Sequence, residues 1–329
     1  MSEKKLYNAL GLIIDPYYDK NLAELDSIKI FNIENDIVDI KIALGNKTKD
    51  QEQVKLEIAK LVKITFSYKG VKIEVIDSDR KALIKEEKYI YIGIASGKGG
   101  VGKSNVTANL AVAFNRLGIK TGVIDADVYG ATIPYLFSLP ISPLDVTDDD
   151  KIIPANKEGV QVVSTEFFMP EDKPVLWRGP MLGKLLTHYF NEVAWENETK
   201  LILIDLPPGT GDIALDIKEY VPTSKMIIVT TPSLSASHVA IKAGLAAQEM
   251  NHDIIGVIEN MSYFYDAEHK KYHYLLGEGG GKKVAEKLET ELLIQLPMQE
   301  NSDKIYENNH MNAKMFLALA DRIKKILEL

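Results

Sequence analysis

The spacing of hydrophobic residues divides the chain into two parts. In the N-terminal part, helical and strand-like periods alternate and predict elements in the order α-β-β-α-β over residues 6–13, 28–33, 38–44, 54–62 and 71–76. We expect the first helix to end at Asp15-Pro16, because proline disfavours the helical conformation in the residue before it. This order predicts a small α+β domain whose sheet carries its helices on one face.

The pattern changes at Tyr89. Continuous apolar runs now predict strands at 90–95, 121–125, 201–206, 226–230 and 254–258, and helical periods separate them, as at 104–117 and 235–250. Such alternation is typical of an α/β fold with a mostly parallel sheet covered by helices on both faces. The intervening stretch, DRKALIKEEK (79–88), is charged and has little sheet character. We therefore predict domains at 1–82 and 89–329, joined by a charged linker at 83–88.

The segment GKGGVGKS lies between the first apolar run and the first helix of the C-terminal domain. Its glycines let the backbone curl so that successive N–H groups point at phosphate oxygens, and the helix N-terminus adds partial positive charge. We expect Lys103 to neutralise the β- and γ-phosphates and Ser104 to bind Mg²⁺. The segment predicts a P-loop NTPase fold whose ATP site contains Gly97, Lys98, Gly99, Gly100, Val101, Gly102, Lys103 and Ser104.

Lys98 is not needed to close this loop. It is either a solvated surface lysine or the signature lysine of the deviant Walker A group, which includes the MinD, ParA and Get-type ATPases. In that group the lysine reaches across a dimer interface to the nucleotide of the other subunit. The intact GKGGVGKS sequence favours the second interpretation, and with it a homodimer that sandwiches the nucleotide.

Three acidic residues follow apolar strands of the same domain. Asp125 and Asp127 lie in VIDADVYG, and Asp205 ends the strand LILID. We expect all three at the carboxyl edge of the sheet, where open α/β sheets bind ligands. Asp205 has the position of a Walker B acid, which holds Mg²⁺ or its water. The turn after it would let the Gly209 N–H sense a γ-phosphate.

Composition narrows the chemistry that the chain can perform. Its 329 residues include no cysteine, which excludes disulfides, thiol catalysis and thiolate metal ligands. A net charge of −8 argues against a general nucleic-acid or anionic-membrane surface. No apolar run approaches the roughly 18 residues that cross a bilayer, and the N-terminus lacks the apolar core of a signal peptide. We therefore expect a cytoplasmic protein without a membrane partner.

Six motifs together resemble the Mrp/ApbC family of P-loop ATPases, known as iron–sulfur cluster carriers. They occur in the family's order between residues 89 and 300: GKGGVGKS, DADVYGATIP, WRGPM, IDLPPGTGD, VTTP and ENMSYF. The N-terminal domain is similar, through IIDP and its element order, to the small iron–sulfur-assembly domain often fused to this family. The resemblance implies Mg²⁺-dependent ATP hydrolysis, in which the protein mainly positions water and stabilises charge.

The resemblance also implies a role for each matching residue. Lys98 would act on the nucleotide of the partner subunit, Lys103 would bind phosphate, and Asp127 would orient the attacking water. Asn260 would contact the adenine edge. The residues that would hold or neighbour the magnesium ion are Ser104, Asp125 and Asp205.

The family's other hallmark is a Cys-x-x-Cys pair just after NMSYF, which bridges an iron–sulfur cluster between two subunits. Asp266 and His269 stand at those positions, so the chain offers the cluster no thiolate. The loop, which also contains Glu268 and His273, is either a site for a harder ion such as zinc or ferrous iron, or an exposed hairpin that contacts a partner. We favour the hairpin, because two ligands on one loop make a poor metal site. The glycines at 279–281 then form the turn into a helix at 282–289.

These patterns predict a Mg-ATP-dependent homodimeric ATPase, and they leave its task open. In one hypothesis the protein assists the delivery of iron–sulfur clusters to apo client proteins while its partners hold the cluster. In a second it is an ATP-gated DNA-binding regulator, which the acidic net charge disfavours. In a third it is an adaptor whose N-terminal domain docks client proteins.

Overall fold

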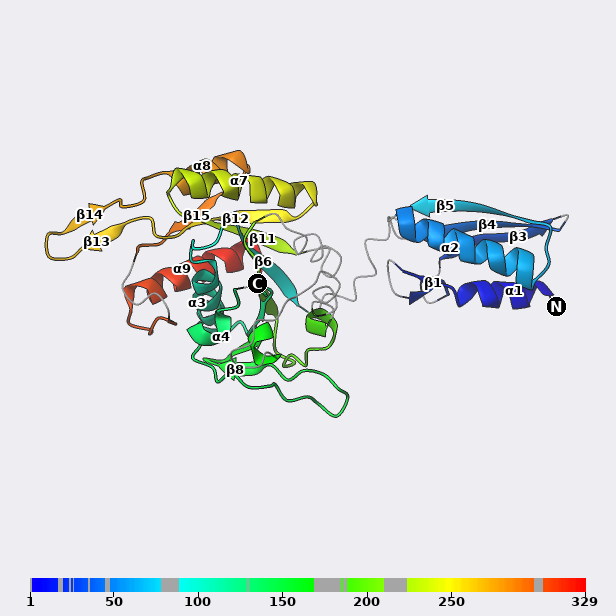
Figure 1. Ribbon diagram of the computed structural model, residues 1–329, viewed down its shortest axis with the longest axis horizontal. Coiled ribbons are helices and arrows are strands. Elements are labelled where there is room, and N and C mark those ends of the chain that lie inside the picture. Colours follow the sequence, from blue (N-terminus) through cyan, green and yellow to red (C-terminus); the bar gives the residue numbers. More distant parts are fainter. Residues whose placement is uncertain are drawn as a thin grey trace. The chain divides into compact units, whose positions relative to one another are not determined.

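The chain forms two compact units, Met1–Glu87 and Lys88–Leu329 (Figure 1). The computed structural model describes residues 2–16, 20–23, 25, 27–34, 36–44, 48–77, 89–128, 130–168, 185, 188–209, 224–298 and 304–329. The predicted linker at 83–88, the WRGPM motif at 177–181 and the last residues of IDLPPGTGD, 210–212, lie outside the described residues.

The N-terminal unit is a three-stranded sheet with its helices on one face (Figure 1). Strand β4 pairs antiparallel with β3 and parallel with β5. Alternate residues of β4, Val38, Ile40 and Ile42, are buried against the helices because side chains alternate between the two faces of a strand. The bounds are α1 (Ser2–Gly11), β3 (Ile28–Glu34), β4 (Ile37–Leu44), α2 (Thr48–Lys60), a π-helical turn (Leu61–Thr65) and β5 (Gly70–Asp77).

The predicted end of the first helix is wrong. Helix α1 ends at Gly11, and Asp15 instead lies in a short hairpin of β1 (Ile14–Asp15) and β2 (Lys20–Asn21). The chain turns at Gly11, where a Cβ atom would lie 3.0 Å from the Cβ of Ala23 on the returning segment. The helix therefore ends at Gly11, where this close approach begins. Pro16 lies further along the chain and does not set the end of the helix.

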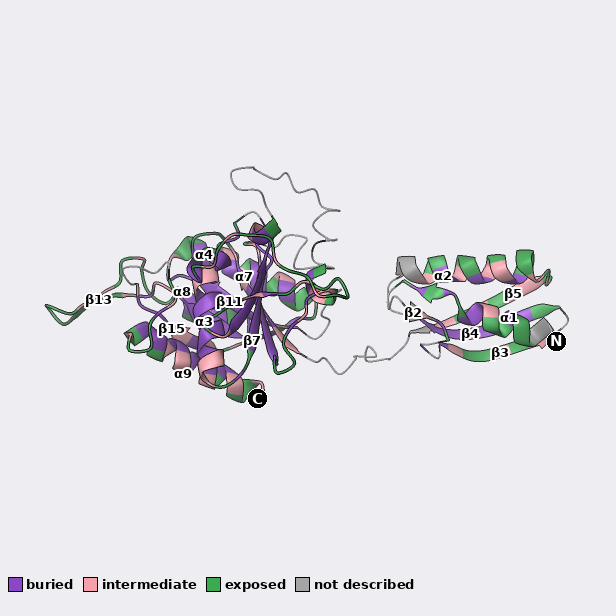
Figure 2. Ribbon diagram, turned by 90° about the horizontal axis from the view of Figure 1, so that it is seen from below, coloured by how far each residue is buried: buried purple, intermediate pink, exposed green. Residues whose placement is uncertain are grey.

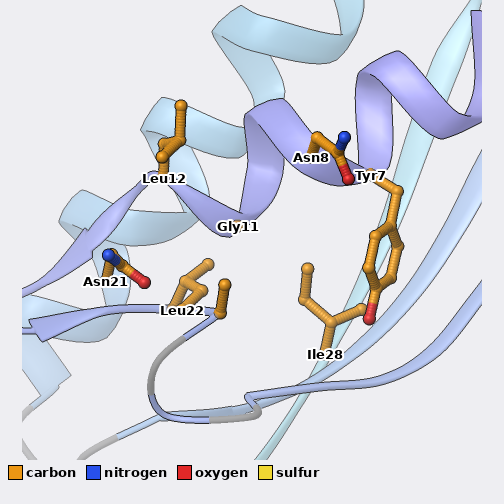
Figure 3. Close-up of a pocket in the computed structure, with 8 residues that line it drawn as sticks. Tyr7, Asn8, Gly11, Leu12, Asn21, Leu22 and Ile28 are labelled. Carbon is orange, nitrogen blue, oxygen red and sulfur yellow. The ribbon is translucent and has the colours of Figure 1, made fainter.

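A cavity of about 590 Å³ opens in this unit between α1, the β1–β2 hairpin and the start of β3 (Figure 3). Apolar side chains and the amides of two asparagines line it. The lining residues are Tyr7, Asn8, Gly11, Leu12, Asn21, Leu22, Ala23 and Ile28. None of them is a residue of the predicted nucleotide site.

The C-terminal unit is built on a sheet that has eight strands within the described residues, in the order β15-β12-β11-β6-β10-β7-β9-β8. Every neighbouring pair is parallel except β8–β9. The strands are β6 (Ile90–Ser96), β7 (Thr121–Asp125), β8 (Ala155–Lys157), β9 (Val160–Ser164), β10 (Leu201–Asp205), β11 (Lys225–Thr230), β12 (Asp253–Glu259) and β15 (Leu292–Gln295).

Helices cover both faces of this sheet. Helices α3 (Lys103–Arg116) and α9 (Met311–Ile326) lie on one face, and α7 (Leu234–Glu249) and α8 (Gly280–Lys287) lie on the other. On β10, Leu201 and Leu203 belong to the first core, and Ile202 and Ile204 to the second. Burial on both faces explains the continuous apolar runs, and Figure 2 shows these strands as buried. The predicted α/β fold is confirmed.

Two smaller elements complete the C-terminal unit. A short helix, α4 (Ile133–Leu136), follows β7, and a hairpin of β13 (Phe264–Asp266) and β14 (Lys271–His273) follows β12. Figure 1 shows the hairpin extending away from the body of the unit. Across the parts of the chain that the structure describes, no helix combines the length and apolarity needed to cross a bilayer.

Candidate nucleotide site

The predicted nucleotide-binding residues gather at the carboxyl edge of the large sheet. Strand β10 lies between β6 and β7, and its last residue, Asp205, is in register with Ile94 on β6 and Asp125 on β7. The loop 97–102 leaves β6 at this edge and enters α3 directly. Parallel strands thus bring together acids and a loop that are far apart in the sequence.

Two glycines of the loop allow close approaches. A Cβ atom on Gly97 would lie 2.2 Å from the carbonyl carbon of Val239, so the loop touches the backbone of α7. Gly102 precedes α3 with a φ of 81°, a conformation that favours glycine, and a Cβ there would lie 2.2 Å from the Asn260 amide nitrogen. These two contacts fix the position of the phosphate loop and of the N-terminus of α3 that follows it.

Lys103 and Ser104 meet at the carboxylate of Asp205, which is wholly buried. The Lys103 ammonium lies 2.7 Å from Asp205 Oδ2, and the Ser104 hydroxyl donates to the same oxygen at 2.6 Å. One turn further along α3, the Thr107 hydroxyl donates to Asp205 Oδ1 at 2.7 Å. Hydroxyl and carboxylate oxygens are the donors that Mg²⁺ prefers, so Ser104 and Asp205 fit the ion predicted here.

Asp127 is the second carboxylate near the Lys103 ammonium, at 3.5 Å. Burial raises its pKa above the ordinary value, and the positive charge of Lys103 opposes that shift. The Asp127 carboxylate and the Asp205 carboxylate therefore share one ammonium group at the N-terminus of α3. Phosphate oxygens that bind at this terminus compete with both carboxylates for the Lys103 charge.

Asp125 is fully buried at the end of β7. Its oxygens accept hydrogen bonds from the Ser164 hydroxyl at 3.0 Å and from the backbone N–H groups of Asp127 and Ile133, both at 3.3 Å. Burial, together with the negative charge of Asp205, raises the pKa of Asp125 to about 8. In this state Asp125 is largely protonated at neutral pH, which lowers the negative charge of the cluster.

Lys98 points away from this buried cluster. Its side chain is exposed, and its ammonium donates to the hydroxyl of Ser235 at the start of α7, at 3.1 Å. No carboxylate of the described residues forms an ion pair with it. The Gly209 N–H, which we expected to sense a γ-phosphate, donates to the carbonyl of Ser96 at 2.8 Å in this structure.

Asn260 contacts the phosphate loop from the end of β12. Its amide nitrogen donates to the Val101 carbonyl at 2.9 Å, and its backbone N–H donates to the Thr230 carbonyl at 2.8 Å. Of the two amide atoms only the nitrogen can donate, so this contact orients the amide and leaves Oδ1 as an acceptor and the second N–H as a donor. Asn260 is thus held against the phosphate loop, and its predicted contact with the adenine edge stays a prediction.

Asp266 and His269 lie in the β13–β14 hairpin, where they bind each other. Asp266 Oδ1 accepts the backbone N–H groups of Glu268 and His269, and its Oδ2 lies 2.7 Å from His269 Nδ1 and 3.9 Å from His273 Nε2. The hydrogen bonds from His269 hold the pKa of Asp266 below its ordinary value. Within the described residues, no group of three or more metal-ligating side chains is placed to hold an ion.

The structure adds residues that the sequence patterns did not single out. Thr107 follows Lys103 by one helical turn, so its spacing was a usable signal for the face that contacts Asp205. Ser164 reaches Asp125 only because β9 pairs with β7, and Ser235 reaches Lys98 only because α7 packs against the loop. Neither of these two contacts could be predicted from the local sequence.

The sheet order, the phosphate loop and the acids at its edge define the class of this protein as a P-loop NTPase. A known family matches over residues 88–328, the ParA-type NUBPL iron-transfer P-loop NTPases. The chain is 37% identical to the iron–sulfur cluster carrier protein of Bacillus subtilis, over 98% of this chain and 97% of that one. It is 38% identical to the protein of the same name from Saccharolobus solfataricus, over 78% and 90% of the two chains.

Solved structures agree with this assignment. A nucleotide-binding protein from Archaeoglobus fulgidus in complex with ADP has a TM-score of 0.56 and 31% identity, over 72% of this chain and 90% of that one. The cell division ATPase MinD of Pyrococcus furiosus, at 24% identity and a TM-score of 0.51 over 72% and 99% of the chains, shows the fold alone.

The chain therefore belongs to the NUBPL iron-transfer P-loop NTPase family. This membership confirms the resemblance to the Mrp/ApbC ATPases and the prediction that the protein is an ATP-hydrolysing enzyme. The roles of individual residues, the dimer and the cargo stay predictions.

Proposed function

We propose that the protein is a magnesium-dependent, homodimeric ATPase that assists the transfer of iron–sulfur clusters to apo client proteins. The observation that supports the ATPase chemistry is the buried group of Lys103, Asp205 and Asp127 at the N-terminus of α3. Lys103 would exchange its carboxylate partners for the β- and γ-phosphate oxygens of ATP. Ser104 and Asp205 would hold the magnesium ion, which when bound neutralises phosphate charge.

Asp127 is the candidate for orienting the attacking water. Asp127 is only 9% exposed, and its carboxylate lies 3.5 Å from the Lys103 ammonium, which marks the phosphate position. Burial raises its pKa, so it is a better proton acceptor than an ordinary aspartate. Asn260 would use its Oδ1 acceptor on the amino group of adenine, because the hydrogen bond to Val101 directs its amide nitrogen toward the phosphate loop.

The environment of Lys98 supports the proposal that the protein forms a homodimer. Its exposed ammonium donates to a neutral hydroxyl and so keeps its charge for an anion outside the protomer. We expect ATP with magnesium to convert a monomer into a dimer, and Lys98→Ala to remain monomeric while it still binds one nucleotide per chain. Sedimentation velocity with and without ATP measures this, and a Lys98→Ala dimer would exclude the bridging role.

The proposed cargo is an iron–sulfur cluster that a partner holds. Relatives spanning the whole chain are named iron–sulfur cluster carriers, but this chain has no cysteine. At the positions of the family's cysteines, Asp266 and His269 bind each other, and hard or borderline ligands of this kind do not replace four thiolates. We therefore infer that the client or donor protein supplies the thiolates and that this chain supplies the ATP-dependent step.

Replacing Lys103 tests the proposed function. Lys103→Ala removes the ammonium from the phosphate site, so ATP hydrolysis should fall by about a hundredfold or more. Transfer of a cluster from a cysteine-bearing donor protein to an apo iron–sulfur enzyme should lose its ATP stimulation in the same variant. Lys200→Ala, which removes an exposed lysine before β10, is the matched control and should retain both activities.

Two results would contradict the proposal. Equal stimulation of transfer by wild type and by Lys103→Ala would separate the ATPase from cluster delivery. A stable cluster on the isolated protein, after anaerobic incubation with iron and sulfide and detected by its optical spectrum, would show that the chain holds its own cargo.

A further inference from the structure

Thr107 is a wholly buried threonine that contacts the carboxylate proposed to hold magnesium. It lies on α3, one turn after Lys103, and its hydroxyl lies 2.7 Å from Asp205 Oδ1. The other oxygen of that carboxylate, Oδ2, receives the Lys103 ammonium at 2.7 Å and the Ser104 hydroxyl at 2.6 Å. Because Asp205 is itself wholly buried, each of these contacts replaces hydration that the carboxylate has lost.

The Thr107 hydroxyl has one hydrogen and two acceptors within reach. One acceptor is Asp205 Oδ1, and the other is the Lys103 carbonyl at 3.0 Å. A threonine inside a helix can donate to the carbonyl one turn earlier, and that contact alone would make Thr107 an ordinary helical residue. In a regular α-helix, however, the Lys103 carbonyl already accepts the Thr107 backbone N–H. The carboxylate oxygen is nearer and belongs to a charged group, so it is the stronger acceptor and takes the hydroxyl hydrogen.

The three side-chain contacts of Asp205 have different fates when nucleotide binds. Under the proposed function, Lys103 exchanges the carboxylate for phosphate oxygens, and Ser104 turns its oxygen to the magnesium ion. Thr107 takes part in neither exchange, because it lies a full turn inside the helix and is wholly buried. Among the described side chains that contact Asp205, Thr107 is therefore the one whose hydrogen bond persists.

This persistent hydrogen bond orients the carboxylate. Strand β10 fixes the backbone of Asp205 in register with β6 and β7, but it leaves the side chain free to rotate. Thr107 removes that freedom, since it holds Oδ1 and so leaves Oδ2 facing Ser104. A metal ligand that a neighbouring group already orients binds the ion more tightly, because less ordering is needed at the moment of binding.

We propose that Thr107 is a positioning residue for the magnesium ion of the ATP site: it holds Asp205 Oδ1, so that Oδ2 stays turned toward Ser104 when Lys103 moves to the phosphates. The inference rests on the magnesium role proposed above for Asp205. Thr107 acts through the orientation of that carboxylate and contributes no ligand of its own to the ion.

Thr107→Val in the full-length chain tests this inference, because valine keeps the shape of threonine and lacks the hydroxyl. The probe is Mn²⁺, which prefers the same oxygen ligands as Mg²⁺ and whose binding is followed by electron paramagnetic resonance. With ADP present, the dissociation constant for Mn²⁺ should rise about tenfold, whereas ADP affinity without a divalent ion should stay at the wild-type value. The magnesium concentration that half-saturates ATP hydrolysis should rise by the same factor, with kcat at saturating magnesium little changed.

Two further variants separate the hydroxyl from the shape and the burial of the side chain. Thr107→Ser restores the hydroxyl without the methyl group, so Mn²⁺ affinity should return to within about twofold of wild type. Thr199→Val is the matched control: it removes a buried hydroxyl that donates to Gln161 at the same distance, 2.7 Å. Thr199 lies just before β10 begins, at the opposite edge of the sheet from Asp205, so this variant should bind Mn²⁺ as wild type does.

The outcomes separate this inference from the proposed function. If Asp205→Asn loses Mn²⁺ and Thr107→Val folds and keeps wild-type affinity, Thr107 is an ordinary helical threonine and the inference fails alone. If Asp205→Asn binds Mn²⁺ as wild type does, the magnesium role proposed for Asp205 fails, and this inference fails with it. Equally weak binding by Thr107→Ser and Thr107→Val would also overturn the inference, because the hydroxyl would then not be the group that orients Asp205.

A second variant keeps the test available if Thr107→Val does not fold. Thr107→Ala also removes the hydroxyl, and alanine is the residue that most favours a helix. It should raise the dissociation constant for Mn²⁺ by about the same tenfold factor. Wild-type affinity in this folded variant would overturn the proposal.

Discussion

Asp125 shows how position in a sheet changes the chemistry of a single residue. Its carboxylate ends a fully buried strand, in register with Asp205 on the neighbouring strand. Loss of hydration disfavours the charged form, and the second carboxylate adds repulsion, so the pKa rises from 3.8 to about 8. An acid that appears ordinary in the sequence is therefore largely neutral in the folded protein.

Replacing Asp125 should change how stability depends on pH. The folded state holds a proton on Asp125 that the unfolded state releases above 3.8, so this contribution is complete below 3.8 and is lost as pH rises to about 8. Within that window it should lower the free energy of unfolding by roughly 1 kcal/mol per pH unit. Asp125→Asn removes this slope. Urea unfolding without nucleotide and magnesium, between about pH 5 and pH 8, measures it, and parallel wild-type and variant curves would contradict it.

At the scale of elements, the phosphate loop owes its position to α7. Gly97 lies against the backbone at Val239, and the N-terminal part of α7 also provides Ser235 to Lys98. The helix and the loop are separated by more than a hundred residues, yet they pack without a side chain between them. The motif glycine thus serves the packing of two elements as well as the curl of the loop.

A methyl group at Gly97 should separate these elements. In Gly97→Ala the new Cβ meets backbone atoms, which cannot rotate away as a side chain can, so we expect a loss of about 1–3 kcal/mol in stability and weaker ADP binding. Gly99→Ala is the control for stability: nothing lies within 4 Å of its Cβ position, so its unfolding free energy should stay within about 0.5 kcal/mol of wild type. Equal stability losses in urea unfolding would show that packing against α7 is unimportant.

At the scale of the whole molecule, the two units have separate hydrophobic cores. The core of the N-terminal unit is formed by residues such as Leu6, Ile40 and Val54. The two cores of the C-terminal unit lie on the two faces of the large sheet, and they share no described residue with the first. Units with their own cores are able to fold independently.

We therefore expect residues 89–329 alone to fold and to hydrolyse ATP at the rate of the full chain. Residues 1–82 alone should also fold, and the full chain should unfold in two transitions that match those of the separate parts. Circular dichroism during heating and an ATPase assay measure these properties. An inactive or unfolded 89–329 chain would show that the N-terminal unit is needed to complete the nucleotide site.

Local sequence patterns were sufficient to predict the phosphate loop and the central strands of the large sheet. Residues 97–104 could be recognised as a phosphate loop because their glycines, lysines and serine act through the backbone they directly form. Central strands such as β10 were found because burial on both faces leaves a continuous apolar run. Strands β8 and β15 were missed because they are short and lie at the sheet edges, and β9 was missed because the polar residues Gln161 and Ser164 interrupt its apolar run.

The tertiary structure decided what depends on contacts between distant residues. The chain by itself determined the phosphate loop, the strand ends that carry Asp125 and Asp205, and the absence of thiolates at the hairpin. Only folding could place Ser164 on Asp125 and Ser235 on Lys98, because those partners are neighbours through strand order and helix packing. The energy of a buried charge is set by what surrounds it in space, so the state of these carboxylates could not be obtained from their place in the sequence.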